Sequence, residues 1–367
     1  MSNQHNAGIK ISNLYKIFGP NAGDYVDAVK KGMPKSELLD KHGHVLGLKD
    51  ISLDIPAGSI QVIMGLSGSG KSTLIRHINR LIDPTAGEVI VGGSDVTKMD
   101  QAQLQDFRRS QTAMVFQKFA LLPHRNVLEN VVYGLEIRGV DKAESVNVAK
   151  RWIERVGLKG FEKRYPTQLS GGMQQRVGLA RALSMDAPVL LMDEAYSALD
   201  PLIRMDMQTV LLDIQKEIKK TIVFITHDLD EALRLGDQIS ILRDGQMIQQ
   251  GTKQDIVMRP ADEYVENFVR QVNRAKIVTL EGVMSPVKPN PTLMAPTLQS
   301  WLTIEEAVQI VRSSPDSEFV VVDTLGQPVG LVTLQQLLFA MVAPAALLEG
   351  DASKQPQLAA VPSARRG

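Results

Sequence analysis

A glycine-rich loop between an apolar run and a helix-like segment constrains the fold of this chain more than any other feature. Residues 65–73 follow the pattern G-x-x-x-x-G-K-[ST] and come directly after the mostly apolar run 60–64, which predicts a strand. Glycines let the backbone curl so that successive N–H groups point at phosphate oxygens, and the start of the next helix adds positive potential. The sequence therefore predicts a phosphate loop made of Gly65, Leu66, Ser67, Gly68, Ser69, Gly70, Lys71, Ser72 and Thr73.

Two side chains of this loop have predicted roles of their own. The Lys71 ammonium can reach the β- and γ-phosphates of a nucleoside triphosphate, and the Ser72 hydroxyl can ligate Mg²⁺. Farther along, the apolar run 189–192 ends in Asp193 and Glu194, which is typical of a parallel strand buried on both faces. Asp193 would hold Mg²⁺ through water, and Glu194 could deprotonate the attacking water as a general base. An ordinary strand that ends in an acidic turn would have the same sequence pattern. The assignment of Asp193 and Glu194 to a nucleotide site therefore depends on the other motifs.

A second helix start that could bind an anion lies at residues 169–176, where Ser170 is a plausible N-cap and is followed by Gly171 and Gly172. One subunit cannot use two distant helix starts on one γ-phosphate, so the sequence favours use of this one on a partner's nucleotide. His227 closes another apolar run, 221–226. A histidine at the carboxyl end of a strand in an open α/β sheet faces the ligand crevice.

In this order the motifs resemble those of the ATP-binding subunits of ABC transporters. They are the phosphate loop, Gln117 after a strand, the LSGG signature at 169–172, the aspartate–glutamate strand, the SALD segment at 197–200 and His227. The resemblance covers most of residues 9–275. It implies an α/β P-loop ATPase domain over 1–275, with a RecA-like core and an inserted helical subdomain at about 118–182.

The resemblance also implies the chemistry of the site. The cofactors are ATP and Mg²⁺, and the catalytic side chains are Glu194, His227 and Gln117. The metal is held by Ser72, Asp193 and Gln117. Phosphoryl transfer of this kind is catalysed by positioning and by neutralising charge.

A homodimer follows from the same resemblance. Two subunits pair head to tail, so that each ATP lies between one phosphate loop and Ser170, Gly171 and Gly172 of the other subunit, with Asp200 at the seam. Phe18 fits the upstream aromatic residue that stacks on adenine, and Tyr15 is the rival for that role.

Within the family, the chain resembles most the subunits that import glycine betaine, proline and choline. The supporting features are the loop sequence Gly-Leu-Ser-Gly-Ser-Gly, the signature continuation Gly-Gly-Met and an insertion at about 20–45, where helix formers predict a small helical excursion. The resemblance implies transmembrane permease subunits as partners, a substrate-binding protein as an indirect partner, and a peripheral place on the cytoplasmic face of the inner membrane. An importer ATPase for another small solute, such as an amino acid, and a soluble ABC ATPase outside transport remain the alternatives.

Composition excludes several function classes. The 41 basic residues equal the 41 acidic ones, so no net charge draws the chain to nucleic acid. The chain has no cysteine, which excludes disulfides and thiol catalysis. We expect no signal peptide, because residues 1–5 lack an apolar core, and no membrane span, because the longest apolar run, 337–348, is interrupted by Pro344. His42 and His44 could bind a metal, although a third ligand is not evident.

The sequence changes character near residue 275. Prolines at 286, 289, 291 and 296 suggest a linker, and beyond it we expect a helix at 304–311, strands at 319–323 and 329–333, and a helix at 334–341. This pattern resembles a single CBS module, which would form an α+β domain over 276–345. We expect the Ala- and Pro-rich tail, 346–367, to be disordered.

Overall fold

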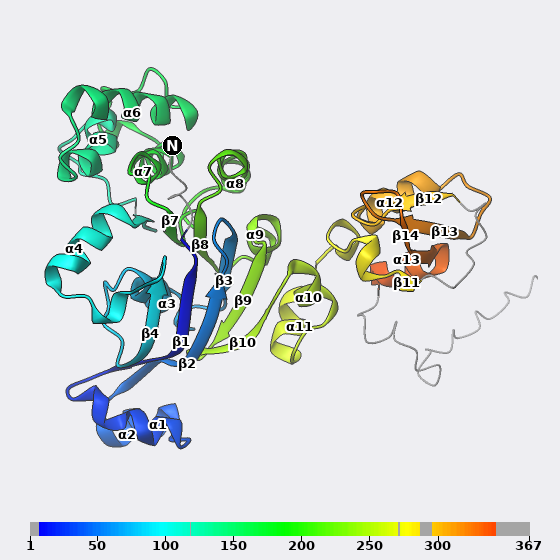
Figure 1. Cartoon of the computed structure of the whole chain (residues 1–367), viewed down its shortest axis with the longest axis horizontal. Coiled ribbons are helices and arrows are strands. Elements are labelled where there is room, and N and C mark those ends of the chain that lie inside the picture. The colour runs from blue at the N-terminus through cyan, green and yellow to red at the C-terminus, as the bar shows by residue number, and fades with distance from the viewer. Residues whose placement is uncertain (1–6, 118, 271, 287–295, 343–367) are drawn as a thin grey trace, which may run out of the picture. The chain divides into compact units, whose positions relative to one another are not determined.

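The computed structural model describes residues 7–117, 119–270, 272–286 and 296–342 of the chain (Figure 1). They form two compact units that divide between Lys253 and Gln254. This division lies earlier than the boundary after residue 275 that the sequence suggested. The reason is that the segment after 253 packs onto the second unit: the Gln254 amide donates a hydrogen bond to the Thr279 hydroxyl, and the turn Arg274–Lys276 contacts two helices of that unit.

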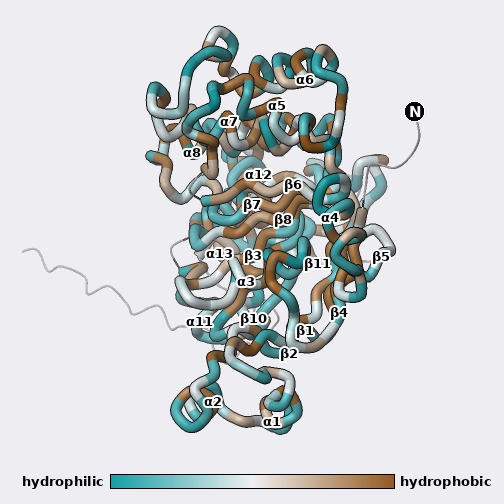
Figure 2. Tube along the Cα trace, turned by 90° about the vertical axis from the view of Figure 1, so that its left-hand side faces the viewer, coloured by the Kyte–Doolittle hydropathy of each residue, from teal (hydrophilic) through white to brown (hydrophobic). Residues whose placement is uncertain are grey.

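The first unit is built around a six-stranded sheet with the order β10-β9-β3-β8-β7-β6, in which only β10 is antiparallel to its neighbour. Every residue of β3, β7 and β8 is buried, as their mostly apolar sequences predict, and Figure 2 shows these strands as largely hydrophobic. Parallel strands place their carboxyl ends at one edge of the sheet, where a ligand crevice forms. The bounds are β3 Ile60–Met64, β6 Thr112–Val115, β7 Val189–Asp193, β8 Thr221–Thr226, β9 Gln238–Arg243 and β10 Gln246–Gly251.

A second, antiparallel sheet of the same unit has the order β2-β1-β4-β5. Its strands are β1 Ile9–Phe18, β2 Val45–Ile55, β4 Ala86–Val91 and β5 Ser94–Asp95. One apolar cluster joins its residues, such as Ile51 and Val89, to Ile63 of β3 and to Leu74 of α3 (Lys71–Ile78). The cluster also includes Phe107 of α4 (Gln101–Ser110). Burial of this shared core fixes the two sheets and α3 as one body.

A glycine substitution tests the packing between β1 and β4. Gly87 has a φ of +97°, and a Cβ there would lie 2.4 Å from the Asn13 carbonyl oxygen. We expect Gly87→Ala to lower the free energy of unfolding by about 2–4 kcal/mol, because backbone strain and a clash with main-chain atoms add together. Urea denaturation measures the change. Gly23→Ala is the matched control, because nothing lies within 4 Å of its Cβ position, and an equal loss in both variants would contradict the prediction.

The predicted helical subdomain is present as α5 (Val127–Ile137), α6 (Lys142–Arg155) and α7 (Gly171–Ser184), which pack on one another. Each helix begins at a side-chain cap, since the Asn126, Asp141 and Ser170 side chains accept hydrogen bonds from backbone N–H groups of the first turn. The helix α7 extends two residues past the predicted end of the subdomain and leads into β7. It therefore joins this subdomain to the central sheet. The long helix α8 (Pro201–Ile218) and the short α9 (Leu229–Leu235) follow β7 and β8.

The insertion between β1 and β2 is helical, as predicted. It contains the 3-10 turn Ala22–Tyr25, α1 (Val26–Lys30) and α2 (Lys35–His42). Its apolar side chains, including Val29 and Leu38, form a small cluster with Tyr15 and Ile17 of β1. This cluster anchors α1 and α2 beside the ends of β1 and β2 (Figures 1 and 2).

The histidine pair of the insertion does not support a metal site. The two ring nitrogens of His44 lie 2.6 Å from the His42 carbonyl oxygen and 2.7 Å from the Pro20 carbonyl oxygen. The ring also packs on Tyr25. In the part of the chain that the structure describes, no group of three or more His, Cys, Asp or Glu side chains is placed to hold a metal ion.

The second unit contains a four-stranded sheet with the order β11-β14-β13-β12. The predicted helices and strands are confirmed as α12 Ile304–Val311, β13 Glu318–Val322, β14 Pro328–Thr333 and α13 Leu334–Val342. They are accompanied by α10 Lys253–Met258, which begins at the division between the units, and by α11 Glu263–Val269, β11 Ser285–Pro286 and β12 Thr297–Gln299. Pro289, Pro291 and the tail 346–367 lie outside the described residues. No helix in the described ranges is long and apolar enough to cross a membrane.

Candidate functional site

The phosphate loop joins β3 to α3, as predicted, and two of its glycines cannot carry a side chain. Gly65 has a φ of +150°, and a Cβ there would lie 2.2 Å from the Leu242 carbonyl oxygen. Gly70 has a φ of +100°, and its Cβ would lie 2.9 Å from the Gly47 carbonyl oxygen. Close packing against backbone atoms of β2 and β9 therefore holds the loop in its curled form.

Lys71 is the buried cation of the loop. Its Nζ donates hydrogen bonds to the carbonyl oxygens of Gly65 at 2.8 Å and Leu66 at 3.0 Å. It also lies 3.8 Å from Oε1 of Glu194. Burial lowers the pKa of Lys71, and the carboxylates of Glu194 and Asp193 act in the opposite direction by stabilising the charged form. The site thus keeps a cation beside two carboxylates.

Ser72 and Asp193 come together from distant parts of the chain. The Ser72 hydroxyl donates to Oδ1 of Asp193 at 2.7 Å, and the Arg76 guanidinium pairs with Oδ2 of Asp193 at 3.1 Å. A hydroxyl and a carboxylate are hard oxygen donors of the kind that Mg²⁺ prefers. Arg76 was not predicted, although its spacing four residues after Ser72 places both on one face of α3 and could have indicated it.

The three predicted catalytic side chains also meet. The Gln117 amide donates to Oε2 of Glu194 at 3.0 Å, and Nδ1 of His227 lies 3.8 Å from the same oxygen. These residues follow β6, β7 and β8, which are neighbours in the sheet. Glu194 has a φ of +45°, a backbone conformation that is uncommon outside glycine and that clusters at functional sites.

A cavity of about 430 Å³ opens over this edge of the sheet and is the candidate nucleotide site. Phe18 lines it, and a Cβ on Gly47 would lie 2.6 Å from the Phe18 ring, so the glycine leaves room for that ring. Tyr15 is buried in the cluster under the insertion, so it is not available to stack on a ligand. The residues that line the cavity are Phe18, Lys35, Val45, Leu46, Gly47, Ser67, Gly68, Gly70, Lys71, Ser72, Thr73, Gln117 and Glu194. Lys35 was not predicted from the sequence.

The signature residues and Asp200 lie at the starts of α7 and α8, not in the lining of the described cavity that contains Lys71. The Ser170 hydroxyl accepts from the Met173 N–H at 3.3 Å and caps α7, as predicted. A Cβ on Gly172 would lie 2.6 Å from a side-chain carbon of Ile203 on α8. Asp200 caps α8 by accepting from the Ile203 N–H at 3.1 Å. These residues do not line the described cavity that contains Lys71, so the second helix start is not part of the same chain's phosphate site.

A buried carboxyl group contacts Thr226, the last residue of β8, directly before His227 in the sequence. Glu231 on α9 accepts hydrogen bonds from the Thr226 hydroxyl at 2.5 Å and from the Gln208 amide at 3.2 Å. Burial raises its pKa, and these hydrogen bonds oppose the rise without cancelling it. The network attaches the end of β8, and with it His227, to α8 and α9.

This group gives a pH-dependent prediction. Because the pKa of the acid is raised above its ordinary value of 4.5, the folded chain keeps a proton that the unfolded chain has released. The free energy of unfolding therefore falls as pH rises above that value. We expect Glu231→Gln to remove the part of the decrease in stability with pH that Glu231 causes. Melting temperatures from about pH 5 to about pH 8 measure this change. Glu144→Gln, an exposed control, should follow the wild type, and parallel curves for all three proteins would contradict the prediction.

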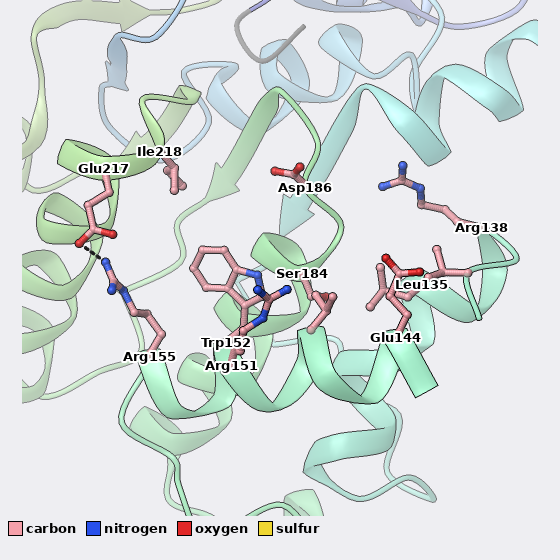
Figure 3. Close-up of a pocket in the computed structure, with 12 residues that line it drawn as sticks. Leu135, Arg138, Glu144, Arg151, Trp152, Arg155, Ser184, Asp186, Glu217 and Ile218 are labelled. Atoms are coloured by element: carbon pink, nitrogen blue, oxygen red, sulfur yellow. Dashed lines mark ion pairs between the residues drawn. The ribbon is translucent and has the colours of Figure 1, made fainter. Parts of the chain in front are cut away.

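A second cavity, of about 520 Å³, lies against α6 (Figure 3). Trp152 and Arg155 line it, and Arg155 pairs with Glu217 of α8. Asp186 at its rim pairs with Lys220 at 2.7 Å. The predicted site residues do not line this described cavity, so it has no place in the phosphate chemistry.

The fold and the site define a P-loop nucleotide-binding cassette, and comparisons with known proteins agree. Residues 48–197 match the family model described as ABC transporter. The glycine betaine transport ATP-binding protein OpuAA of Bacillus subtilis is 54% identical over 276 residues, which cover 75% of this chain and 66% of that protein. The glycine betaine/carnitine transport ATP-binding protein GbuA of Listeria monocytogenes is 51% identical over 276 residues, which cover 75% and 70%.

A solved dimeric ATP-binding cassette, in a post-hydrolysis state bound to ADP and Pi, is 32% identical with a TM-score of 0.57. It covers 67% of this chain and 98% of that one. The chain belongs to the ATP-binding proteins of ABC transporters, in the family that includes the glycine betaine transport ATP-binding proteins. It spans about two thirds of the length of these curated relatives.

Proposed function

We propose that this protein hydrolyses ATP in a head-to-tail homodimer to drive uptake of glycine betaine, proline or choline-type osmoprotectants through separate membrane subunits. The observation that carries the ATPase is the convergence of Lys71, Ser72, Asp193, Glu194 and His227 at the carboxyl edge of one parallel sheet. The similarity to glycine betaine transport proteins supports the solute class.

The phosphate loop would bind the triphosphate. The loop N–H groups and the Lys71 ammonium, which now bonds two loop carbonyls, would bind the β- and γ-phosphates. Mg²⁺ would be held by Ser72, Asp193 and Gln117. Gln117 would use its amide oxygen, because its amide nitrogen donates a hydrogen bond to Glu194. When bound, Mg²⁺ would neutralise phosphate charge and lower the cost of charge development.

Hydrolysis would use the groups at the ends of β7 and β8. Glu194 accepts the proton of the attacking water, and Gln117 fixes the orientation of its carboxylate. His227 would hold the γ-phosphate and the water in line. The partner subunit's Ser170 and the partner subunit's Gly172 would close on the γ-phosphate, and loss of that phosphate would let the two halves separate.

Transport reconstitution tests the solute class. The full chain, its permease and its binding protein are placed in vesicles with ATP on the side of this chain, and uptake of labelled glycine betaine, choline, proline and methionine is measured. Uptake of glycine betaine, choline or proline above methionine supports the proposal. ATP-driven uptake of methionine alone would favour the alternative importer, and ATPase activity without uptake would favour a role outside transport.

We also propose that residues 276–345 contribute a single CBS-like module and that the protein is peripheral to the cytoplasmic face of the membrane. The order strand, helix, strand, strand, helix from β12 to α13 supports the module. The family supports the location, because these ATP-binding proteins serve transporters.

A further inference from the structure

The insertion between β1 and β2 places a lysine in the nucleotide cavity. Lys35 is the first residue of α2 and lines the same cavity of about 430 Å³ as Phe18 and the phosphate loop. Leu38, three residues later, is fully buried in the cluster under the insertion. Residues three apart share one face of a helix, so burial of Leu38 directs Lys35 toward the body of the domain.

The cavity has two cationic side chains among the described residues that line it. The Lys71 side chain is 4% exposed and is held by two loop carbonyls, whereas the Lys35 side chain is 44% exposed. Lys35 therefore has the freedom to reach a ligand that enters the cavity. A lysine ammonium is a point charge on a flexible stem and is suited to bind phosphate oxygens.

Lys35 is now held by a weak ion pair. Its Nζ lies 3.6 Å from Oδ1 of Asp244, in the turn between β9 and β10, and the Asp244 side chain is 70% exposed. Exposed ion pairs stabilise a protein by about 0–1 kcal/mol. Little stabilisation is therefore lost when Lys35 leaves this carboxylate for a more highly charged phosphate chain.

The turn that carries Asp244 is fixed to the phosphate loop. The N–H of Gly245 donates to the Ser69 carbonyl oxygen at 3.0 Å, and the Lys49 N–H donates to the Gly245 carbonyl oxygen at 2.8 Å. A Cβ on Gly245 would lie 2.6 Å from the Gly47 carbonyl oxygen. Asp244 therefore keeps Lys35 beside the loop before a nucleotide arrives.

We propose that Lys35 is a nucleotide-binding residue, whose ammonium leaves Asp244 and binds the phosphate chain of the nucleotide. The insertion then contributes directly to the affinity for ATP and ADP. This inference rests on the proposed function, since it assigns a further residue to the same nucleotide site.

Substitutions of the two ion-pair partners test whether Lys35 binds the nucleotide, because they are expected to change ADP binding differently. Lys35→Gln should weaken binding of ADP, measured by calorimetry with the full chain, by about fivefold, because one charge-assisted contact is lost. Asp244→Asn should leave ADP binding unchanged or tighten it, because the competing carboxylate is removed. Asparagine tolerates the φ of +51° at this position. Lys35→Arg should restore affinity, and Lys41→Gln, an exposed lysine of α2 paired with Glu37, should have no effect.

Adenosine separates phosphate binding from other contacts. We expect Lys35→Gln to leave adenosine affinity unchanged, because adenosine has no phosphate. Equal weakening of ADP binding by Lys35→Gln and Asp244→Asn would show a purely structural ion pair and overturn the inference. Unchanged ADP affinity in Lys35→Gln, or an equal loss for adenosine, would overturn it as well. A wild-type chain that binds neither ATP nor ADP would instead overturn the proposed function.

Discussion

Glu194→Gln is expected to bind ATP as tightly as the wild type and to hydrolyse it at least about a hundredfold more slowly. The amide has nearly the shape of the carboxylate, so the contacts with Gln117 and His227 can persist, but it cannot accept a proton from water. Phosphate release at saturating ATP and Mg²⁺ measures the rate, and calorimetry measures the affinity.

The matched control for this variant is Glu154→Gln, on the exposed face of α6, where the side chain pairs only with Lys159 among the described ion pairs. It should hydrolyse ATP at the wild-type rate. Wild-type turnover by Glu194→Gln would show that Glu194 is not the general base. Another group would then have to accept the proton of the attacking water.

Lys71→Ala is expected to weaken ATP binding by about a hundredfold or more, because it removes the buried ammonium that we propose to make charge-assisted hydrogen bonds to phosphate. The loss should be specific to the phosphates. Adenosine affinity should be retained, because Phe18, which we propose to stack on adenine, is unchanged. Calorimetric titration with ATP and with adenosine measures both effects.

Lys159→Ala, an exposed lysine of the helical subdomain, is the control and should bind both ligands normally. If Lys71→Ala bound ATP with wild-type affinity, the loop at 65–73 would not be the phosphate site. An equal loss of ATP and adenosine affinity would instead indicate a distorted cavity.

The central sheet and most of the site were predictable from the sequence, because the signals are local. The mostly apolar run at 60–64 and the apolar runs at 189–192 and 221–226 are long enough to identify strands buried on both faces, and all three strands are confirmed. Parallel order then brings the residues after each strand to one edge. For this reason Lys71, Asp193 and His227 could be assigned to one site before their distances were known.

Other features depend on contacts between distant segments and left no local signal. Lys35 and Asp244 are far apart in the chain, and each is an ordinary exposed charge in the sequence. The division at Lys253 differs from the predicted boundary because Gln254 reaches Thr279, a contact that composition cannot indicate. The raised pKa of Glu231 likewise comes first from burial among α8, α9 and β8, which the sequence around residue 231 does not indicate, and the nearby Asp228 carboxylate adds to it.

The molecular mass of Glu194→Gln in solution tests most directly whether two copies of this chain enclose ATP between them. The chain has a mass of 40.3 kDa. Sedimentation equilibrium should give this mass without nucleotide, twice this mass with saturating ATP and Mg²⁺, and the single-chain mass again with ADP. A mass of one chain at saturating ATP, also when the cognate permease is present, would contradict a shared nucleotide site.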